Sequence, residues 1–335
     1  MDQGNIKLVD LTLRFDGNRP DPDRFKSDPN DPTRPDPDSH APHPPIEAAI
    51  VAGLIRQGNL NYAGFIQSCK AVKGEAFEQR KDVKTASEHW LFLNKSEVAI
   101  GDTGVTYQNP YAAVLGCIDA RVPVELITGQ ASNDMFVIRT AGNILTELGE
   151  ASGSMHYILS NYAVDAPHRG AHKSVSAILV LGHTKCGAVA SAYDAFKPGG
   201  PGTVGLPPSL ASILYEIKPA VDFVLGATRL TDPDDVKDAI SMVNAVISHL
   251  KIKKMAEESG TFPGLTVFYG TYDVSDFYLH STNIPDYPDR RFPQALAARG
   301  IEKSFSWSNG WPDLDRSLRE ALAQDATDFA TRRRR

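Results

Sequence analysis

Two short polar segments of this sequence each follow an apolar run, and both carry residues suited to binding a metal ion. The first is Gly116–Arg121 (GCIDAR), and the second is Gly182–Gly187 (GHTKCG). Cysteine thiolates and a histidine imidazole are preferred ligands of Zn²⁺, which takes them in tetrahedral geometry. Because His183 and Cys186 are three residues apart, one turn can aim both side chains at the same ion. The sequence therefore predicts a zinc site formed by Cys117, His183 and Cys186.

A set of three protein ligands indicates a zinc ion that takes part in chemistry. A catalytic zinc keeps an open position for water or substrate, whereas a structural zinc is usually closed by a fourth Cys or His. The chain has three cysteines, and the third, Cys69, lies in an apolar helical stretch with no matching partner nearby. A purely structural zinc and a metal-free pair of buried cysteines are the alternatives to a catalytic ion.

Asp119 and Arg121 lie close enough to Cys117 in sequence to serve the same site. The arginine can hold the carboxylate in a bidentate ion pair, which keeps it ionised and off the metal. The carboxylate can then accept a hydrogen bond from a zinc-bound water, whose pKa the ion lowers to about 7. This interpretation gives a hydroxide nucleophile near neutral pH, and an ordinary ion pair at the end of a strand is the alternative.

Four apolar runs separated by helical segments predict the elements that bring these residues together. The expected strands are Tyr111–Cys117, Met135–Arg139, Ala177–Gly182 and Leu265–Tyr269. Strands that are apolar throughout and alternate with helices are typical of a parallel sheet covered on both faces. Such sheets bind ligands at the carboxyl ends of their strands. We therefore predict an α/β fold with a mainly parallel sheet of four or five strands, flanked by helices, and the site at its carboxyl edge.

Helices are expected beside these strands. Apolar residues at helical spacing predict a helix that starts near Ile46 and breaks at Gly58-Asn59, with a second helix from Asn61. The segment over residues 234–258 carries one apolar stripe and is the clearest helix of the chain. Further helices are expected over residues 150–162, after Gly187, and over residues 315–329.

Composition suggests how the chain is divided. Its 335 residues are enough for one large domain or two. Residues 1–45 are rich in Pro and Asp, which favours an extended arm rather than a helix. We divide the rest into a helical segment (46–105), an α/β catalytic core (106–285) and a C-terminal extension (286–335).

Charge and hydropathy exclude some classes of function. With 35 Lys and Arg against 41 Asp and Glu, the formal net charge is -6, which does not favour nucleic acid binding. No apolar run approaches the roughly 20 residues of a membrane helix. The N-terminus lacks a basic-then-apolar signal pattern, so we expect a cytoplasmic protein. A reducing compartment suits cysteines that bind a metal rather than form disulfides.

The motifs, taken together and in order, resemble those of the β-class carbonic anhydrases. They are Cys117-x-Asp119-x-Arg121, Arg139-x-Ala141-Gly142-Asn143 and His183-x-x-Cys186-Gly187, followed by Gly270-Thr271-Tyr272-Asp273. The resemblance covers roughly residues 105–280. Any one of these motifs alone would be a weak signal, whereas all of them in this order are specific.

The resemblance implies a zinc enzyme that reversibly hydrates carbon dioxide to bicarbonate by a zinc-bound hydroxide. It assigns the metal to the three ligands named above, and the support of the water to Asp119 and Arg121. By the same resemblance, Gln108 and the backbone N–H of Gly187 hold a substrate oxygen. It also implies that the chain forms a homodimer or a larger homo-oligomer.

The sequence departs from the family pattern at two positions near the motifs. Ala120 stands where the family usually has Ser, and Thr140 where it usually has Asn. Loss of the serine hydroxyl removes a hydrogen bond around the site. The loop over residues 197–208, rich in Pro and Gly, also has no counterpart in the family pattern. Together with Ala120, it makes hydrolysis of carbonyl sulfide or carbon disulfide an alternative reaction. A zinc-stabilised or bicarbonate-sensing assembly module is the non-catalytic alternative.

Overall fold

The computed structural model describes most of the predicted core and parts of its flanks. The described residues are 46–71, 110–130, 134–164, 175–260, 262–280, 282–284, 307–308, 311–312 and 316–332. The expected arm over residues 1–45 lies outside them, as do residues 72–105 of the helical segment. The division into four parts therefore stays a prediction.

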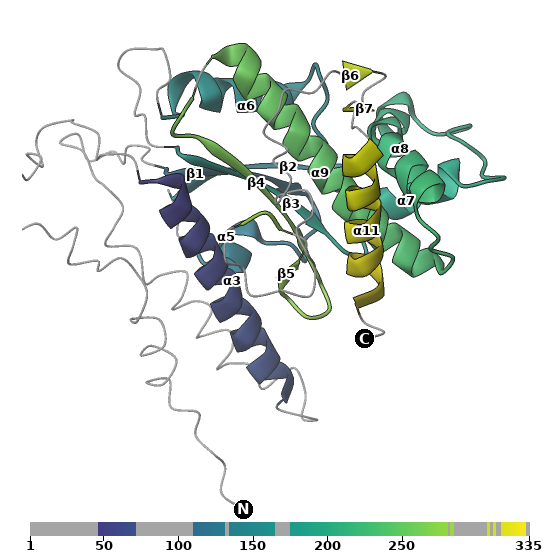
Figure 1. Ribbon diagram of the computed structural model, residues 1–335, viewed down its shortest axis with the longest axis horizontal. Helices are drawn as coiled ribbons and strands as arrows, with labels where there is room; N and C mark the ends of the chain where they lie inside the picture. The colour runs from purple at the N-terminus through teal and green to yellow at the C-terminus, as the bar shows by residue number, and fades with distance from the viewer. Residues whose placement is uncertain are drawn as a thin grey trace, which may run out of the picture.

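A five-stranded sheet lies at the centre of the described structure, in the order β2-β1-β3-β4-β5 (Figure 1). β1 pairs in parallel with β2 and β3, β3 pairs in parallel with β4, and β5 is antiparallel to β4. The predicted mainly parallel sheet is therefore confirmed. The strands are β1 (Ala112–Cys117), β2 (Met135–Thr140), β3 (Ala177–His183), β4 (Thr266–Tyr272) and β5 (Leu279–His280).

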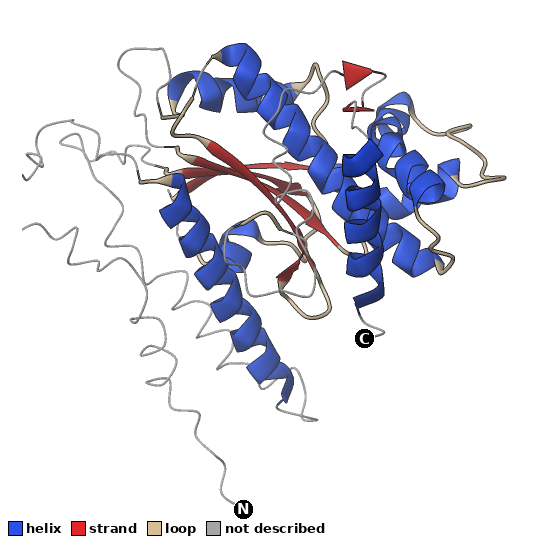
Figure 2. Cartoon of the chain, in the orientation of Figure 1, coloured by secondary structure: helices blue, strands red, loops and turns tan. Residues whose placement is uncertain are grey.

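The central strands β1 and β3 are buried on both faces, because helices cover each side of the sheet. Figure 2 shows these helices above and below the strands. Ala113 and Leu115 of β1 belong to one apolar cluster, whereas Ala112 and Val114 belong to the other. This two-sided burial explains why the residues of both strands are mostly apolar along their whole length, instead of alternating between apolar and polar.

Two layers of helices enclose the sheet, and each shares one of the apolar clusters with it. One layer holds α3 (Ala48–Ala71) and α5 (Val124–Thr128). The other holds α6 (Glu150–Asn161), α7 (Gly187–Phe196), α8 (Pro208–Ala227) and α9 (Pro233–Ser259). A further helix, α11 (Arg316–Thr331), packs against α9 and α8. Smaller elements are the 3-10 turn η3 (Ala141–Asn143) and the hairpin of β6 (Trp307–Ser308) and β7 (Trp311–Pro312).

The helix α3 runs without interruption, so the predicted break at Gly58-Asn59 is wrong. Gly58 lies where α3 crosses the end of α5, and a Cβ there would come within 1.8 Å of the backbone oxygen of Thr128. Asn59 is buried, donating to the backbone oxygen of Phe277 at 3.1 Å and accepting from the N–H of Leu279 at 2.9 Å. These two residues serve a close helix contact and a buried hydrogen-bond pair, and they do not end the helix.

Replacing Gly58 with alanine is expected to lower the free energy of unfolding. The added Cβ would overlap the backbone of α5, and such overpacking typically costs about 1–3 kcal/mol. Gly53→Ala on the same helix is the matched control, because a Cβ there meets nothing within 4 Å. That control should stabilise the protein by about 0.5–1 kcal/mol. Urea-induced unfolding measures both variants, and equal stabilities would contradict the close crossing of α3 and α5.

The helices α8 and α9 differ from expectation. All residues from Asp238 to Leu250 are buried, so the predicted single apolar stripe of α9 is too narrow. The reason is that α8 and α11 pack on the sides of α9 that the sheet leaves open. α8 was not predicted, because it starts at Pro208 after a loop rich in Pro and Gly and contains Pro219.

In the described part of the chain, no helix combines the length and apolarity that crossing a membrane requires.

Candidate metal centre

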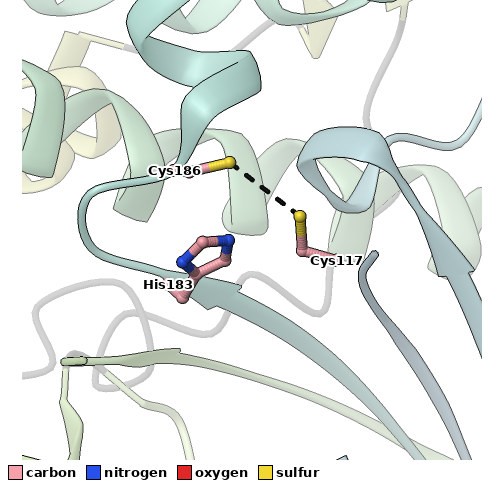
Figure 3. Close-up of side chains that lie close together, drawn as sticks. All are labelled: Cys117, His183 and Cys186. Atoms are coloured by element: carbon pink, nitrogen blue, oxygen red, sulfur yellow. Dashed lines mark hydrogen bonds between the residues drawn. The ribbon is translucent and has the colours of Figure 1, made fainter. Parts of the chain in front are cut away.

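Cys117 and His183 end two neighbouring strands, β1 and β3, at the carboxyl edge of the sheet. The chain passes from β1 to β2 on one side and later to β3 on the other side. Open α/β sheets bind their ligands at such a topological switch point, where the strand order reverses. Cys186 immediately precedes α7. Figure 3 shows the three side chains facing one another from the two strand ends and the start of the helix.

The three predicted ligands converge on one point. The Sγ atoms of Cys117 and Cys186 are 4.0 Å apart, and one nitrogen of His183 lies within 4.8 Å of both. Two sulfurs bound at about 2.3 Å to one tetrahedral zinc lie roughly 3.8 Å apart. The spacing of the two sulfurs therefore fits a zinc ion without a change of backbone. All three residues are buried.

The imidazole of His183 is oriented as a metal ligand requires. Its Nδ1 lies 2.9 Å from the backbone oxygen of Thr184. Because a carbonyl oxygen only accepts hydrogen bonds, Nδ1 carries the proton and the lone pair is on Nε2. Nε2 is buried and has no hydrogen-bond partner among the described residues. A buried acceptor without a partner costs free energy, and a metal ion at this point would remove that cost.

The two thiols differ in acidity because they contact each other. The hydrogen bond from Cys186 lowers the pKa of Cys117 to about 4, although burial opposes this shift. The same hydrogen bond, together with burial, raises the pKa of Cys186. The lowered pKa of Cys117 favours its thiolate form, and the thiolate is the form of cysteine that binds a metal ion. The donor set of two sulfurs and one imidazole nitrogen fits zinc.

Residues other than the three predicted ligands hold Cys117 in place. The backbone N–H of Gly142 in η3 donates to its Sγ at 3.3 Å. From β2, Arg139 donates to the backbone oxygen of Cys117 at 2.7 Å and to that of Asp119 at 2.6 Å. Gly142 has a φ of 70° and Asn143 one of 46°, which Gly and Asn adopt more readily than other residues. These residues belong to a motif quoted above, but no role at the site was predicted for them. Arg139 lies opposite Gly116 in the parallel register.

Asp119 and Arg121 form the predicted bidentate pair. The Nε and Nη2 atoms of Arg121 donate to Oδ1 and Oδ2 of Asp119 at 3.0 and 2.7 Å, and its backbone N–H donates to Oδ1 at 2.9 Å. These hydrogen bonds lower the pKa of Asp119 to about 2 against the opposing effect of burial. The same guanidinium donates to the backbone oxygen of Lys185 at 3.0 Å, so it also braces the loop between His183 and Cys186.

Known proteins resemble the stretch that carries this centre. Residues 112–277 match the carbonic anhydrase family. A carbonic anhydrase of Mycolicibacterium smegmatis is 30% identical over 171 residues, which are 50% of this chain and 73% of that relative. The chain belongs to the β-carbonic anhydrase family. The prediction of family and of enzyme class from the motifs is thereby confirmed.

Other similar proteins match over stretches of different length. Carbonic anhydrase 2 of Mycobacterium tuberculosis is 38% identical over 92 residues, which are 28% of this chain and 38% of that protein. A β-carbonic anhydrase of Coccomyxa, solved in complex with acetazolamide, has a TM-score of 0.45 and 19% identity, covering 60% of this chain and 85% of that one.

The structure describes only one of the two predicted substrate-binding residues of this β-carbonic anhydrase. Gly187 is the first residue of α7, directly after the predicted ligand Cys186. A Cβ built on Gly187 meets nothing within 4 Å, so there is open space where a side chain would project from this residue. Gln108 lies outside the described residues. The substrate-binding role of both residues stays a prediction, and Cys69 lies on α3 with its side chain outside the described part.

Proposed function

We propose that this chain is a zinc-dependent carbonic anhydrase that hydrates carbon dioxide to bicarbonate. The observation that carries the proposal is the convergence of Cys117, Cys186 and His183 beside a carboxylate held by Arg121. Those three residues would hold the zinc ion, which when bound makes a water molecule acidic enough to ionise near neutral pH. The cytoplasm, where thiols stay reduced, is the compartment that suits such a site.

Asp119 has the role of orienting the attacking water. Because its pKa is lowered to about 2, its carboxylate is ionised at neutral pH and can only accept hydrogen bonds. By accepting the hydrogen of a water, it directs the lone pairs of that oxygen away from itself and toward the substrate. Arg121 donates a hydrogen bond to each of the two carboxylate oxygens. These bonds keep the carboxylate from turning toward the cation.

The test of this function is stopped-flow hydration of dissolved carbon dioxide, followed with a pH indicator on the zinc-loaded full-length chain. We expect the rate in mildly alkaline buffer to rise in proportion to protein concentration, far above the buffer blank. The same protein should release no hydrogen sulfide from carbonyl sulfide or carbon disulfide. Sulfide release without carbon dioxide hydration would replace the proposal by the alternative reaction, and a rate equal to the blank would refute both.

We also propose that the chain works as a homodimer or a larger homo-oligomer. In the described sheet, β2 is an edge strand, and edge strands offer unpaired N–H and C=O groups to another chain. Most residues of β2 are only half-buried. A hollow between β2 and α6 is lined by Phe136, Ile138 and the exposed Tyr157 among others. A hollow partly lined by apolar side chains, beside the edge strand of the described sheet, supports a second copy at this surface.

Light scattering after size exclusion measures this assembly. We expect a mass at least twice the 36.4 kDa of one chain. Tyr157→Glu should shift the population toward one chain, because a charge would be buried in the interface. Tyr215→Glu on α8 is the matched control, since Tyr157 and Tyr215 are 56% and 54% exposed. A wild-type mass of one chain, or equal shifts for the two variants, would contradict this surface as the interface.

A further inference from the structure

Arg332, which directly follows α11, has a charged side chain buried in the interior. The side chain of Arg332 is only 4% exposed. One of its terminal nitrogens pairs with the carboxylate of Asp273, which follows β4. The other donates to the backbone oxygen of Phe329 at 2.5 Å and lies 3.9 Å from a carboxylate oxygen of Asp238. A buried guanidinium persists only with such partners, so its position is closely defined.

Asp273 also binds Thr184, so the position of Arg332 affects that of Thr184. Its second carboxylate oxygen accepts from the Oγ1 of Thr184 at 3.0 Å and from the N–H of Ser275 at 2.8 Å. Thr184 is held further by two backbone contacts. Its Oγ1 accepts from the N–H of Val274 at 3.2 Å, and its own N–H donates to the backbone oxygen of Tyr272 at 2.9 Å. Both Thr184 and Asp273 are buried.

Thr184 in turn orients a metal ligand. It lies between His183 and Cys186, and its backbone oxygen accepts the hydrogen bond of His183 Nδ1 at 2.9 Å. We propose that Arg332 is a positioning residue of the metal centre, which acts through Asp273 and Thr184 on the imidazole of His183. The inference rests on the proposed function only in that the centre holds a metal. It makes the C-terminal extension a part of the centre.

The surroundings of Asp273 favour this interpretation over a second metal site. Asp273, Asp276 and His280 place ligand atoms within 4.8 Å of one another. Asp276 and His280, however, already contact each other at 2.8 Å, and Arg332 brings its positive charge to Asp273. A divalent cation there would have to overcome the repulsion of a fixed guanidinium. The carboxylate of Asp273 is therefore assigned to the arginine and to Thr184.

The rate of zinc loss to a chelator tests the proposal on the full-length protein. Direct partners of metal ligands typically change metal affinity or activity by about 10–100-fold. Arg332 acts through two further residues, so Arg332→Ala should lose zinc about 10-fold faster than the wild type, at the low end of that range. Arg332→Lys keeps the charge but not the fork geometry, and should lose zinc at an intermediate rate. Arg316→Ala is the matched control on α11, since Arg316 is 92% exposed, and should match the wild type.

A double-mutant cycle with Thr184→Val separates positioning from a merely structural role. If Arg332 acts through Thr184, each single change speeds zinc loss and the double variant is little worse than either. Effects that multiply, or a lower melting temperature with a wild-type rate of zinc loss, would overturn the proposal. If Arg332→Ala does not fold, the same cycle is run with Arg332→Lys, and a wild-type rate for that variant would overturn it.

Carbon dioxide hydration by the same wild-type sample separates this proposal from the proposed function. A wild-type protein that holds zinc without hydrating carbon dioxide would refute the proposed function, while the zinc-loss rates would still decide the role of Arg332. A wild-type protein that is active, with Arg332→Ala indistinguishable from Arg316→Ala, would refute the positioning role alone. A wild-type chain that binds no zinc would refute both.

Discussion

Replacing Cys186 with alanine is expected to lower zinc affinity by more than about 100-fold and to abolish carbon dioxide hydration. The change removes one of three protein ligands, and even the groups that only support such ligands are typically worth about 10–100-fold. The chain should still fold, because Cys186 is one small member of an apolar cluster formed by the sheet and its helices. Metal content after dialysis, circular dichroism and the hydration rate measure the three expectations.

The control for Cys186→Ala is Cys69→Ala, which removes the third thiol of the chain and should keep both zinc and activity. A Cys186→Ala protein that retained zinc and activity would contradict the ligand assignment. A protein that lost its fold or its assembly together with the metal would favour a structural zinc. The non-catalytic module is therefore tested by the same pair of variants.

Replacing Arg121 with alanine is expected to lower the hydration rate on the order of 100-fold while zinc stays bound. The carboxylate of Asp119 would remain but would no longer be held in place, and a positioned proton acceptor is typically worth about 100-fold or more. Asp119 would lose both side-chain hydrogen bonds that Arg121 donates. Without them its pKa rises from about 2 toward the usual value of about 3.9. The carboxylate remains ionised at neutral pH, but it is free to turn toward the cation and block the open position. Stopped-flow rates at matched zinc content measure the effect.

An ion pair elsewhere on the surface provides the control for Arg121→Ala. Lys197 and Asp194 are 2.7 Å apart, so Lys197→Ala breaks a contact of the same kind away from the centre and should leave the rate unchanged. Equal rates for the two variants and the wild type would show that Asp119 needs no partner. Loss of zinc from Arg121→Ala would instead make the arginine a support of the metal loop through Lys185.

The sheet and the meeting of the three ligands could be predicted because both depend on short-range patterns. Apolar runs identify β1 and β3, and the carboxyl ends of parallel strands share one edge, so Cys117 and His183 had to be neighbours. The pairing of Asp119 with Arg121 needs only two residues of separation. The wrongly predicted break of α3 and the missed helix α8 have the same cause. Gly58 and Pro208 are residue types that favour turns, and whether they lie in a helix depends on the packing around them.

The supports of the centre could not be predicted, because they depend on contacts between residues far apart in sequence. Arg139 reaches the backbone of Cys117 only through the register of β2 on β1. Arg332 reaches Asp273 only because α11 packs on α9, and a run of terminal arginines resembles solvated charge. Side chains that hold a site in place carry no local pattern, whereas the ligands do.

The most direct test of the metal centre is X-ray absorption at the zinc edge of the full-length protein. The account predicts one zinc per chain, with two sulfurs at about 2.3 Å, one imidazole nitrogen at about 2.0–2.1 Å and a single further light atom. Cys186→Ala should lose the metal from this spectrum. A shell of four sulfurs, a shell without sulfur, or a chain that retains no zinc would contradict a centre built from Cys117, His183 and Cys186.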